Sequence, residues 1–214
     1  MNDTAPVRAL VIGEDAFEFH RFGAKYPLLR AFLVADGIAL DGTTDRAALA
    51  DLAGYDVVVD YLTDPTMTDA EREGLLGFVR DGGGYVGIHC AADHETFADQ
   101  PADHFEELVG GAFVDHPEPC DLDVRVVDAD HPITEGVDPA FTIHDEPYEV
   151  RWDESVRVLA RMAHPELGDL PVAWTKPYGD GSVFYCSLGH TNAAFAHPAV
   201  QRLLTRGIRW AADT

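Results

Sequence analysis

The sequence predicts an α/β protein in which a doubly wound, mostly parallel sheet is followed by a β-rich extension in the second half. Short apolar runs alternate with helical patterns through residues 7–90, as in parallel strands joined by crossover helices. After residue 111 the pattern changes to strands in which apolar and polar residues alternate, which is typical of half-exposed strands. No linker or internal repeat divides the sequence, so we expect a single domain over residues 1–214.

Local signals place each element of the parallel half. Apolar runs bounded by glycine or turn residues predict strands, at residues 7–13, 37–45 (a short strand and its turn), 55–64 and 85–90. Apolar residues at helical spacing predict helices, at residues 27–35, 45–54 and from 68 to the glycines at 82–84. Thr68 and Glu71 have the spacing of a capping box. Either Thr44 or Asp45 caps the middle helix, and Pro27 suits a first helical turn.

The second half is predicted to be mainly β-structure. Alternating apolar and polar residues indicate strands within residues 120–132, 141–152 and 156–162. Residues 171–190 have the pattern of a hairpin with its turn at residues 179–181. A last helix begins near Pro198 and has apolar residues at helical spacing.

Composition and charge exclude several classes of function. The 38 acidic and 15 basic residues give a net charge of −23, which repels phosphate backbones and anionic membranes, so we expect neither as a partner. No apolar run approaches the roughly 20 residues of a membrane helix, and no signal peptide is recognisable, so a cytoplasmic location is expected. The glycines at 82–84 precede a strand rather than a helix, so no nucleotide cofactor is expected.

Three histidines follow strands whose carboxyl ends meet at one edge of the predicted sheet. His20 lies in the loop after the first strand, His89 ends the strand at 85–90, and His190 ends the hairpin. Ligands of open parallel sheets bind at this edge, so we expect these histidines beside a cleft. Cys90 follows His89 directly and Asp93 comes shortly after it, so both belong to the same region.

Two further stretches contain ionisable groups. His116 lies in GGAFVDHPEP, and TIHDEPYEV contains Asp145, Glu146 and Tyr148. If the second stretch is extended, Glu146 and Tyr148 share one face and Asp145 faces the other way. A bend at Pro147 would break this alternation.

Imidazoles and a carboxylate in these places suit a divalent metal. The expected ligands are His20, His89, His190 and Glu146, with zinc or manganese as the ion and a position left open for water or sugar hydroxyls. No local spacing such as HExxH is present, so such ligands have to converge through the fold. As an alternative, Glu146 and Asp145 act as general acid and base.

Six motifs carry a resemblance to a known family. In order along the sequence they are GGGYVGIHCAAD, GGAFVDHP, DADHPITEG, HDEPYEV, PVAWTKPYGDGSVFYCSLGH and HPAVQRLLTRGIRWAA. Together they resemble the ThuA family, named for trehalose utilisation, over nearly the whole sequence from Val7. The resemblance implies a flavodoxin-like sandwich related to class I glutamine amidotransferases. It also implies an enzyme of carbohydrate metabolism that acts on trehalose or a keto-sugar, and self-association into a homo-oligomer.

Cys90 departs from the family pattern, which usually has serine after the strand-end histidine. In the related amidotransferases this turn holds a nucleophilic cysteine, and the third element of the triad lies two residues beyond a histidine. Here the matching stretch reads His190–Thr191–Asn192, and Asn192 is a poor orienting group. The cysteine is therefore either a thiol nucleophile or a small residue that replaces another small residue.

These observations give three functional hypotheses. In the first, a hydrolase, lyase or isomerase of a small sugar uses His190, His89 and Glu146 for proton transfer or metal binding. In the second, an amidotransferase-like thiol hydrolase uses Cys90 and His190. In the third, the domain binds a sugar without turnover. Substrate contacts are expected from Asp93, His116, Asp145, Tyr148 and Trp174.

Overall fold

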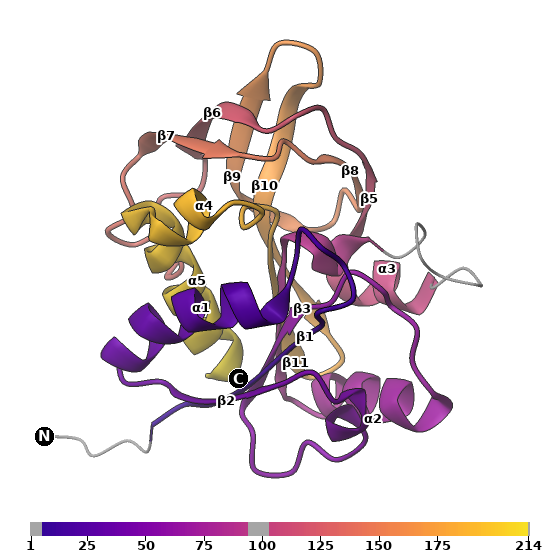
Figure 1. The fold of residues 1–214 in the computed structure, drawn as a ribbon. Helices are drawn as coiled ribbons and strands as arrows, with labels where there is room; N and C mark the ends of the chain where they lie inside the picture. The colour runs from indigo at the N-terminus through magenta and orange to yellow at the C-terminus, as the bar shows by residue number, and fades with distance from the viewer. Residues whose placement is uncertain (1–5, 94–102, 214) are drawn as a thin grey trace, which may run out of the picture.

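The computed structural model describes residues 6–93 and 103–213, which form a mixed α/β fold around one large sheet (Figure 1). The order of strands in this sheet is β2-β1-β3-β4-β11-β10-β9-β6-β7. Their bounds are β1 (Arg8–Gly13), β2 (Ala39–Thr43), β3 (Val57–Tyr61), β4 (Gly84–Ile88), β6 (Cys120–Val126), β7 (Ala140–Asp145), β9 (Arg157–His164), β10 (Gly168–Tyr178) and β11 (Gly181–Cys186). A separate pair consists of β5 (Gly111–Asp115) and β8 (Glu149–Trp152).

The sheet is parallel on one side and antiparallel on the other. Strands β2, β1, β3, β4 and β11 run parallel, whereas β10, β9, β6 and β7 pair antiparallel. The predicted extension is therefore a continuation of the same sheet, which is mixed rather than mostly parallel. The β10–β11 hairpin is the cause, because β11 lies parallel to β4 and its hairpin partner must run in the opposite direction.

Helices cover both faces of the parallel half (Figure 1). They are α1 (Phe22–Ala35), α2 (Asp69–Arg80), α3 (Asp103–Val109), α4 (Asn192–Ala196) and α5 (Pro198–Ala212), with short 3₁₀ helices η1 (Arg46–Ala50) and η2 (His89–Ala92). Alternate residues of β1 belong to two separate cores, one against α1 and α5 and the other against α2. Burial on both faces explains why the strands of this half are continuously apolar.

Most of the predicted elements occur, with differences at their ends. The capping box of Thr68 and Glu71 is confirmed, and the Asp45 side chain caps η1. Helix α1 begins at Phe22, so Pro27 lies in its second turn rather than its first, where proline cannot donate the usual helical hydrogen bond to the Gly23 carbonyl. The structure also contains α3, β5 and α4, which the sequence analysis did not predict. Among the described residues, no helix is long and apolar enough to cross a lipid bilayer.

Two helical glycines are expected to respond in opposite ways to alanine. A Cβ at Gly207 in α5 would lie 2.2 Å from Phe184 Cδ1 on β11, whereas a Cβ at Gly77 in α2 would meet nothing within 4 Å. We expect Gly207→Ala to destabilise the fold by about 1–3 kcal/mol through overpacking. Gly77→Ala should stabilise it by about 0.5–1 kcal/mol because alanine has the higher helix propensity. Urea unfolding of both variants checks this, and equal effects would contradict the packing argument.

Candidate functional site

The candidate site lies at the carboxyl edge of the parallel strands. Strand order reverses at β1, which has β2 on one side and β3 on the other, and such a point is where ligands of open α/β sheets bind. The loops after β1, β4 and β11 bring His20, His89 and His190 there, and the segment after β7 adds Glu146. We call these four residues the His–Glu cluster.

The ring nitrogens and the carboxylate of the His–Glu cluster converge on one small volume. His190 Nδ1 lies 3.1 Å from His20 Nε2, 3.2 Å from His89 Nε2 and 3.2 Å from Glu146 Oε2. His89 Nε2 is 3.3 Å from the same Glu146 oxygen. All four atoms lie within 4.8 Å of one another. The structure thus brings together the four residues that the sequence analysis grouped as metal ligands.

His89 is held in a strained backbone conformation that directs its ring into the cluster. The strand predicted at 85–90 ends at Ile88 in the structure, and His89 begins η2 with a φ of 47°. A positive φ costs energy for a residue other than glycine. Its Nδ1 lies 2.8 Å from the Ser187 carbonyl, and its own carbonyl accepts from the Tyr185 hydroxyl. Because a carbonyl only accepts, Nδ1 carries the proton and Nε2 presents a lone pair to the cluster.

His20 is a neutral imidazole at this site. Burial, together with the neighbouring His89 and His190 rings, lowers its pKa to about 2. Its Nδ1 is 2.9 Å from the Thr63 hydroxyl, which also hydrogen-bonds Cys90. The ring therefore offers a nitrogen rather than a positive charge to the cluster.

The loop that carries His190 is fixed from two sides. Asp145 accepts hydrogen bonds from the backbone N–H groups of Gly189 (2.7 Å) and Thr191 (2.8 Å). On the other side, the Lys25 ammonium donates to the His190 carbonyl and, at 3.0 Å, to Asn192 Oδ1. Asp145, expected as a substrate contact, is fully buried and instead positions this loop.

Glu146 reaches the cluster from the segment between β7 and β8. Asp145 and Glu146 are both buried, at 0% and 4% exposure. Asp145 binds the His190 loop, whereas Glu146 and Tyr148 line a cavity beside the cluster, which is the division of sides expected for an extended segment. Burial by itself raises the pKa of Glu146, but the adjacent His190 and His89 rings outweigh it and hold the pKa well below its usual range. Glu146 is therefore an ionised carboxylate.

This geometry fits a tetrahedral metal ion. Bonds of about 2.0–2.1 Å from a central zinc to nitrogen and oxygen place the ligand atoms about 3.3–3.4 Å apart. Four of the six separations between the ligand atoms, at 3.1–3.3 Å, are close to this spacing, and all six are within 4.8 Å. Neutral imidazoles and one carboxylate are also the donors that zinc or manganese accepts. The residues present are thus able to hold such an ion.

A cavity of about 340 Å³ opens beside the cluster. Its wall combines aromatic and polar side chains, which are Phe17, Phe19, His20, Thr63, Asp93, Phe113, His116, Glu118, Pro119, Glu146, Tyr148 and His190. Three expected substrate contacts, Asp93, His116 and Tyr148, therefore lie on the wall. The exposed ring of Phe19 (62%) stacks near His190, with centroids 6.4 Å apart. Such a small, mixed cavity is typical of a site for a small molecule.

Besides His89 and Asp145, two predicted site residues, Trp174 and Cys90, do not line this cavity. Trp174 is fully buried, and its indole N–H donates to the Val109 carbonyl at 2.8 Å, so it packs in the core instead of stacking on a ligand. Cys90 is also fully buried, and burial raises the pKa of its thiol well above the usual value. A thiol in this state is a poor nucleophile.

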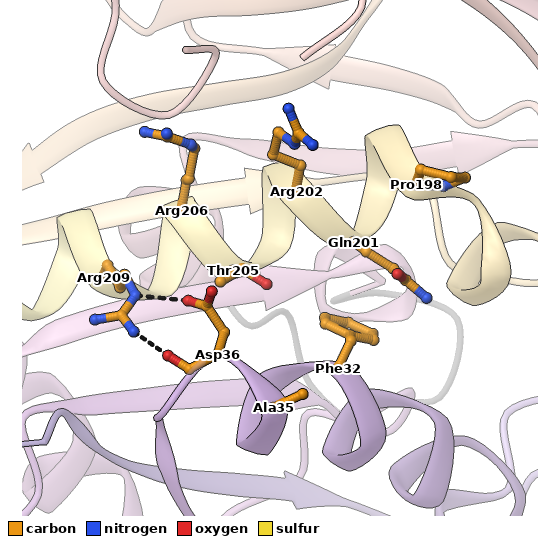
Figure 2. Close-up of a pocket in the computed structure, with 9 residues that line it drawn as sticks. All are labelled: Phe32, Ala35, Asp36, Pro198, Gln201, Arg202, Thr205, Arg206 and Arg209. Carbon is orange, nitrogen blue, oxygen red and sulfur yellow. Dashed lines mark hydrogen bonds and ion pairs between the residues drawn. The ribbon is translucent and has the colours of Figure 1, made fainter. Parts of the chain in front are cut away.

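A larger hollow of about 700 Å³ lies between α1 and α5, away from the cluster. Figure 2 shows that Arg209 is bonded to Asp36 across it, while Arg202 and Arg206 point away from α1. Arg206 pairs with Glu135, and Arg202 donates to the Gly136 carbonyl. These cations do not converge on a common point, so we place the functional site at the His–Glu cluster.

Sequence reasoning missed several residues of the site. Phe17, Phe19 and Thr63 line the cavity, and Lys25 holds the His190 loop. Lys25 had a usable signal, because it is one of only two lysines in the sequence and lies in a mainly apolar helix whose other charged residue is Arg30. Residues 94 and 95, part of the ionisable run after Asp93, lie outside the described residues.

The fold and site define an α/β protein with a histidine-rich centre at the edge of its sheet. The sequence matches the ThuA family, described as trehalose utilisation, over residues 8–211. The protein therefore belongs to the ThuA family. No curated protein matches the sequence.

Solved structures similar to this one include two ThuA-like proteins. One from Parabacteroides merdae is 20% identical, with a TM-score of 0.84 over 98% of this chain and 91% of that one. Another from Bacteroides uniformis is 26% identical, with a TM-score of 0.80 over 97% and 92% of the two chains. A cytoplasmic protein from Salmonella typhimurium is 16% identical, with a TM-score of 0.70 over 96% and 99%.

Asp60, at the end of β3, is expected to make stability depend on pH. Burial raises its pKa to about 6, although hydrogen bonds from Leu62 and Tyr85 oppose this. Between its unfolded pKa of 3.8 and about 6, the folded carboxyl keeps its proton and the unfolded one loses it, so stability falls as pH rises. We expect Asp60→Asn to be more stable than wild type near pH 7.5 by up to about 3 kcal/mol, and equally stable near pH 4. Urea unfolding at both pH values checks this, and a constant difference would contradict it.

Proposed function

We propose that this protein is a metal-dependent enzyme of carbohydrate metabolism, with the His–Glu cluster as its centre. The observation that carries the proposal is the convergence of three imidazole nitrogens and one carboxylate oxygen within 4.8 Å, next to a cavity. Three buried lone pairs and a negative charge at this spacing repel one another unless protons or a cation lie between them. A divalent cation such as zinc or manganese satisfies all four ligands at once.

The surroundings of the ligands support this assignment. Metal-bound histidines commonly bond a backbone or side-chain partner through their other nitrogen, which fixes the tautomer. The Nδ1 atom of His89 contacts the Ser187 carbonyl, and the Nδ1 atom of His20 contacts the Thr63 hydroxyl. The loop of His190 is held by Asp145 and Lys25. These contacts support the assignment of the cluster as a metal site.

A neutral sugar or keto-sugar fits the cavity. The exposed ring of Phe19 suits the apolar face of a sugar ring, while Asp93 and His116 offer partners for its hydroxyl groups. The net charge of −23 disfavours anionic substrates. A bound divalent ion would supply Lewis acidity toward a sugar carbonyl or hydroxyl. Family membership supports this substrate class through the description trehalose utilisation.

The thiol hydrolase alternative has less support. A nucleophile at a sharp strand-to-helix turn is held by strain with its reactive atom exposed. Here the residue with positive φ is His89, while Cys90 is buried and its pKa is raised. We therefore favour the His–Glu cluster over Cys90 as the reactive centre.

The proposal also includes the type of fold and the cellular location. The parallel half and its two helical layers agree with a flavodoxin-like, doubly wound arrangement. A cytoplasmic location agrees with the description of the similar Salmonella protein. A single domain and a homo-oligomer stay predictions of the sequence.

Metal content tests the proposal directly. We expect tag-free protein to contain or take up about one zinc or manganese per chain, and His89→Gln and His190→Gln to lose it, because each removes a ligand. His164→Gln is the matched control, since this ring accepts only local bonds from Glu166 and Leu167. Elemental mass spectrometry of the purified proteins gives the readout.

Turnover tests the enzymatic part. The metal-loaded protein is incubated with trehalose, other disaccharides and their keto derivatives, and products are followed by chromatography and mass spectrometry. Metal-dependent turnover that His89→Gln loses is the expected result. Absence of metal after reconstitution would remove the proposed centre, while metal and sugar binding without turnover would leave a sugar-binding domain.

Lys25 is expected to position a ligand rather than to bind metal itself. Replacement by the similarly sized methionine removes its bonds to the His190 carbonyl and Asn192, so Lys25→Met should weaken zinc affinity about 10–100-fold. Lys176→Met is the control, because Lys176 is likewise partly desolvated and donates to a carbonyl, that of Glu107, outside the site. Competition with a chromophoric chelator measures both affinities, and equal losses would contradict the positioning role.

A further inference from the structure

His116 lies beside the His–Glu cluster without belonging to it. It follows β5, and the pairing of Asp115 with Glu149 brings it next to Glu146 and Tyr148. Its Nδ1 lies 3.1 Å from Glu146 Oε1, the oxygen that does not face His89 and His190. Among the described residues that line the cavity, His20 and His190 belong to the cluster, whereas His116 does not.

The surroundings of His116 determine which of its nitrogens carries the proton. Nδ1 is 3.1 Å from the Pro117 carbonyl oxygen and 3.1 Å from Glu146 Oε1. Both oxygens are acceptors, and a lone pair on Nδ1 would be repelled by each of them. The proton therefore lies on Nδ1, and the neutral ring has its lone pair on Nε2.

The ring is both held and accessible. It stacks on Tyr148 with centroids 6.1 Å apart and planes 24° from parallel, and it also packs near Phe113 at 5.7 Å. The side chain nevertheless keeps 40% of its surface exposed on the cavity wall. A carboxylate on one nitrogen and an accessible lone pair on the other is the arrangement of an oriented general base.

We propose that His116 is the proton-transfer residue of this site. The inference rests on the proposed function and adds a role to it. Glu146 then acts through both oxygens, since Oε2 belongs to the metal ligands and Oε1 holds the Nδ1–H of His116. This division leaves His89 and His190 as ligands and gives the proton chemistry to a residue outside the cluster.

The step is a balanced proton transfer. An O–H bond of the sugar, or a C–H bond next to its carbonyl, breaks, and an N–H bond forms at His116 Nε2. The electron pair stays on the sugar oxygen or carbon, and the Glu146 carboxylate stabilises the resulting imidazolium. Return of the same proton to the product restores the neutral ring.

The first test measures the tautomer in the full-length, zinc-loaded protein. Long-range ¹H–¹⁵N correlation spectra of ¹⁵N-histidine protein report which ring nitrogen is protonated, and the His116→Gln variant assigns the signal. We expect Nδ1–H for His116. An Nε2–H tautomer, or a metal-bound signal for this ring, would overturn the proposal.

The second test separates this role from the metal site. We expect His116→Gln to keep wild-type zinc content, and kcat on the sugar turned over by wild type to fall about 10²–10⁴-fold with little change in KM. Added imidazole should restore part of the activity of His116→Ala, which a purely structural role would not allow. Zinc loss in His116→Gln, or unchanged kcat, would refute this inference alone. If the wild-type protein neither binds zinc nor turns over a sugar, the proposed function is refuted. The tautomer of His116 in the metal-free protein then still shows whether its Nδ1–H is bonded to Glu146.

Discussion

The site depends on one buried carboxylate that has imidazoles instead of lysine or arginine as its neighbours. Glu146 has 4% of its surface exposed, and its ion-pair partners among the described residues are His89, His116 and His190. Burying a carboxylate is unfavourable without compensating hydrogen bonds or charge. The fold supplies this compensation by holding ring nitrogens at fixed positions, and the same arrangement prepares a place for a cation.

Holding the imidazoles requires local strain that the parallel sheet is able to support. His89 has a positive φ and is fixed by Tyr185, Ser187 and the ring of Tyr148. Strained residues persist where the surrounding structure determines them from several sides. The strands beneath are buried on both faces, so the loops at their carboxyl edge extend from a well-packed part of the sheet.

The antiparallel half completes the site that the parallel half begins. Strand β7 pairs with β6 and delivers Asp145 and Glu146 at its end. The separate β5–β8 pair sets His116 next to Tyr148. Three histidines therefore come from the sheet edge. The carboxylate, its third histidine contact, His116, and much of the cavity wall come from the later strands. Neither half contains the whole arrangement.

The sequence by itself determined the features that depend on neighbouring residues. The parallel strands, the capping box at Thr68, the ThuA family and the placing of three histidines at one edge all follow from local patterns or motifs. Glu146 was recognised as a candidate, but both an extended and a bent course of its segment agreed with the sequence.

Only the tertiary structure decided the features that depend on distant contacts. The different partners of Asp145 and Glu146, the burial of Cys90 and Trp174, the role of Lys25 and the direction of the second half all arise from pairing across the chain. Local propensity does not predict these contacts, because segments far away in the sequence determine which residues are buried and which partners they have. The sequence therefore supplied the chemical groups of the site, and the packing of the two halves decided which of them meet.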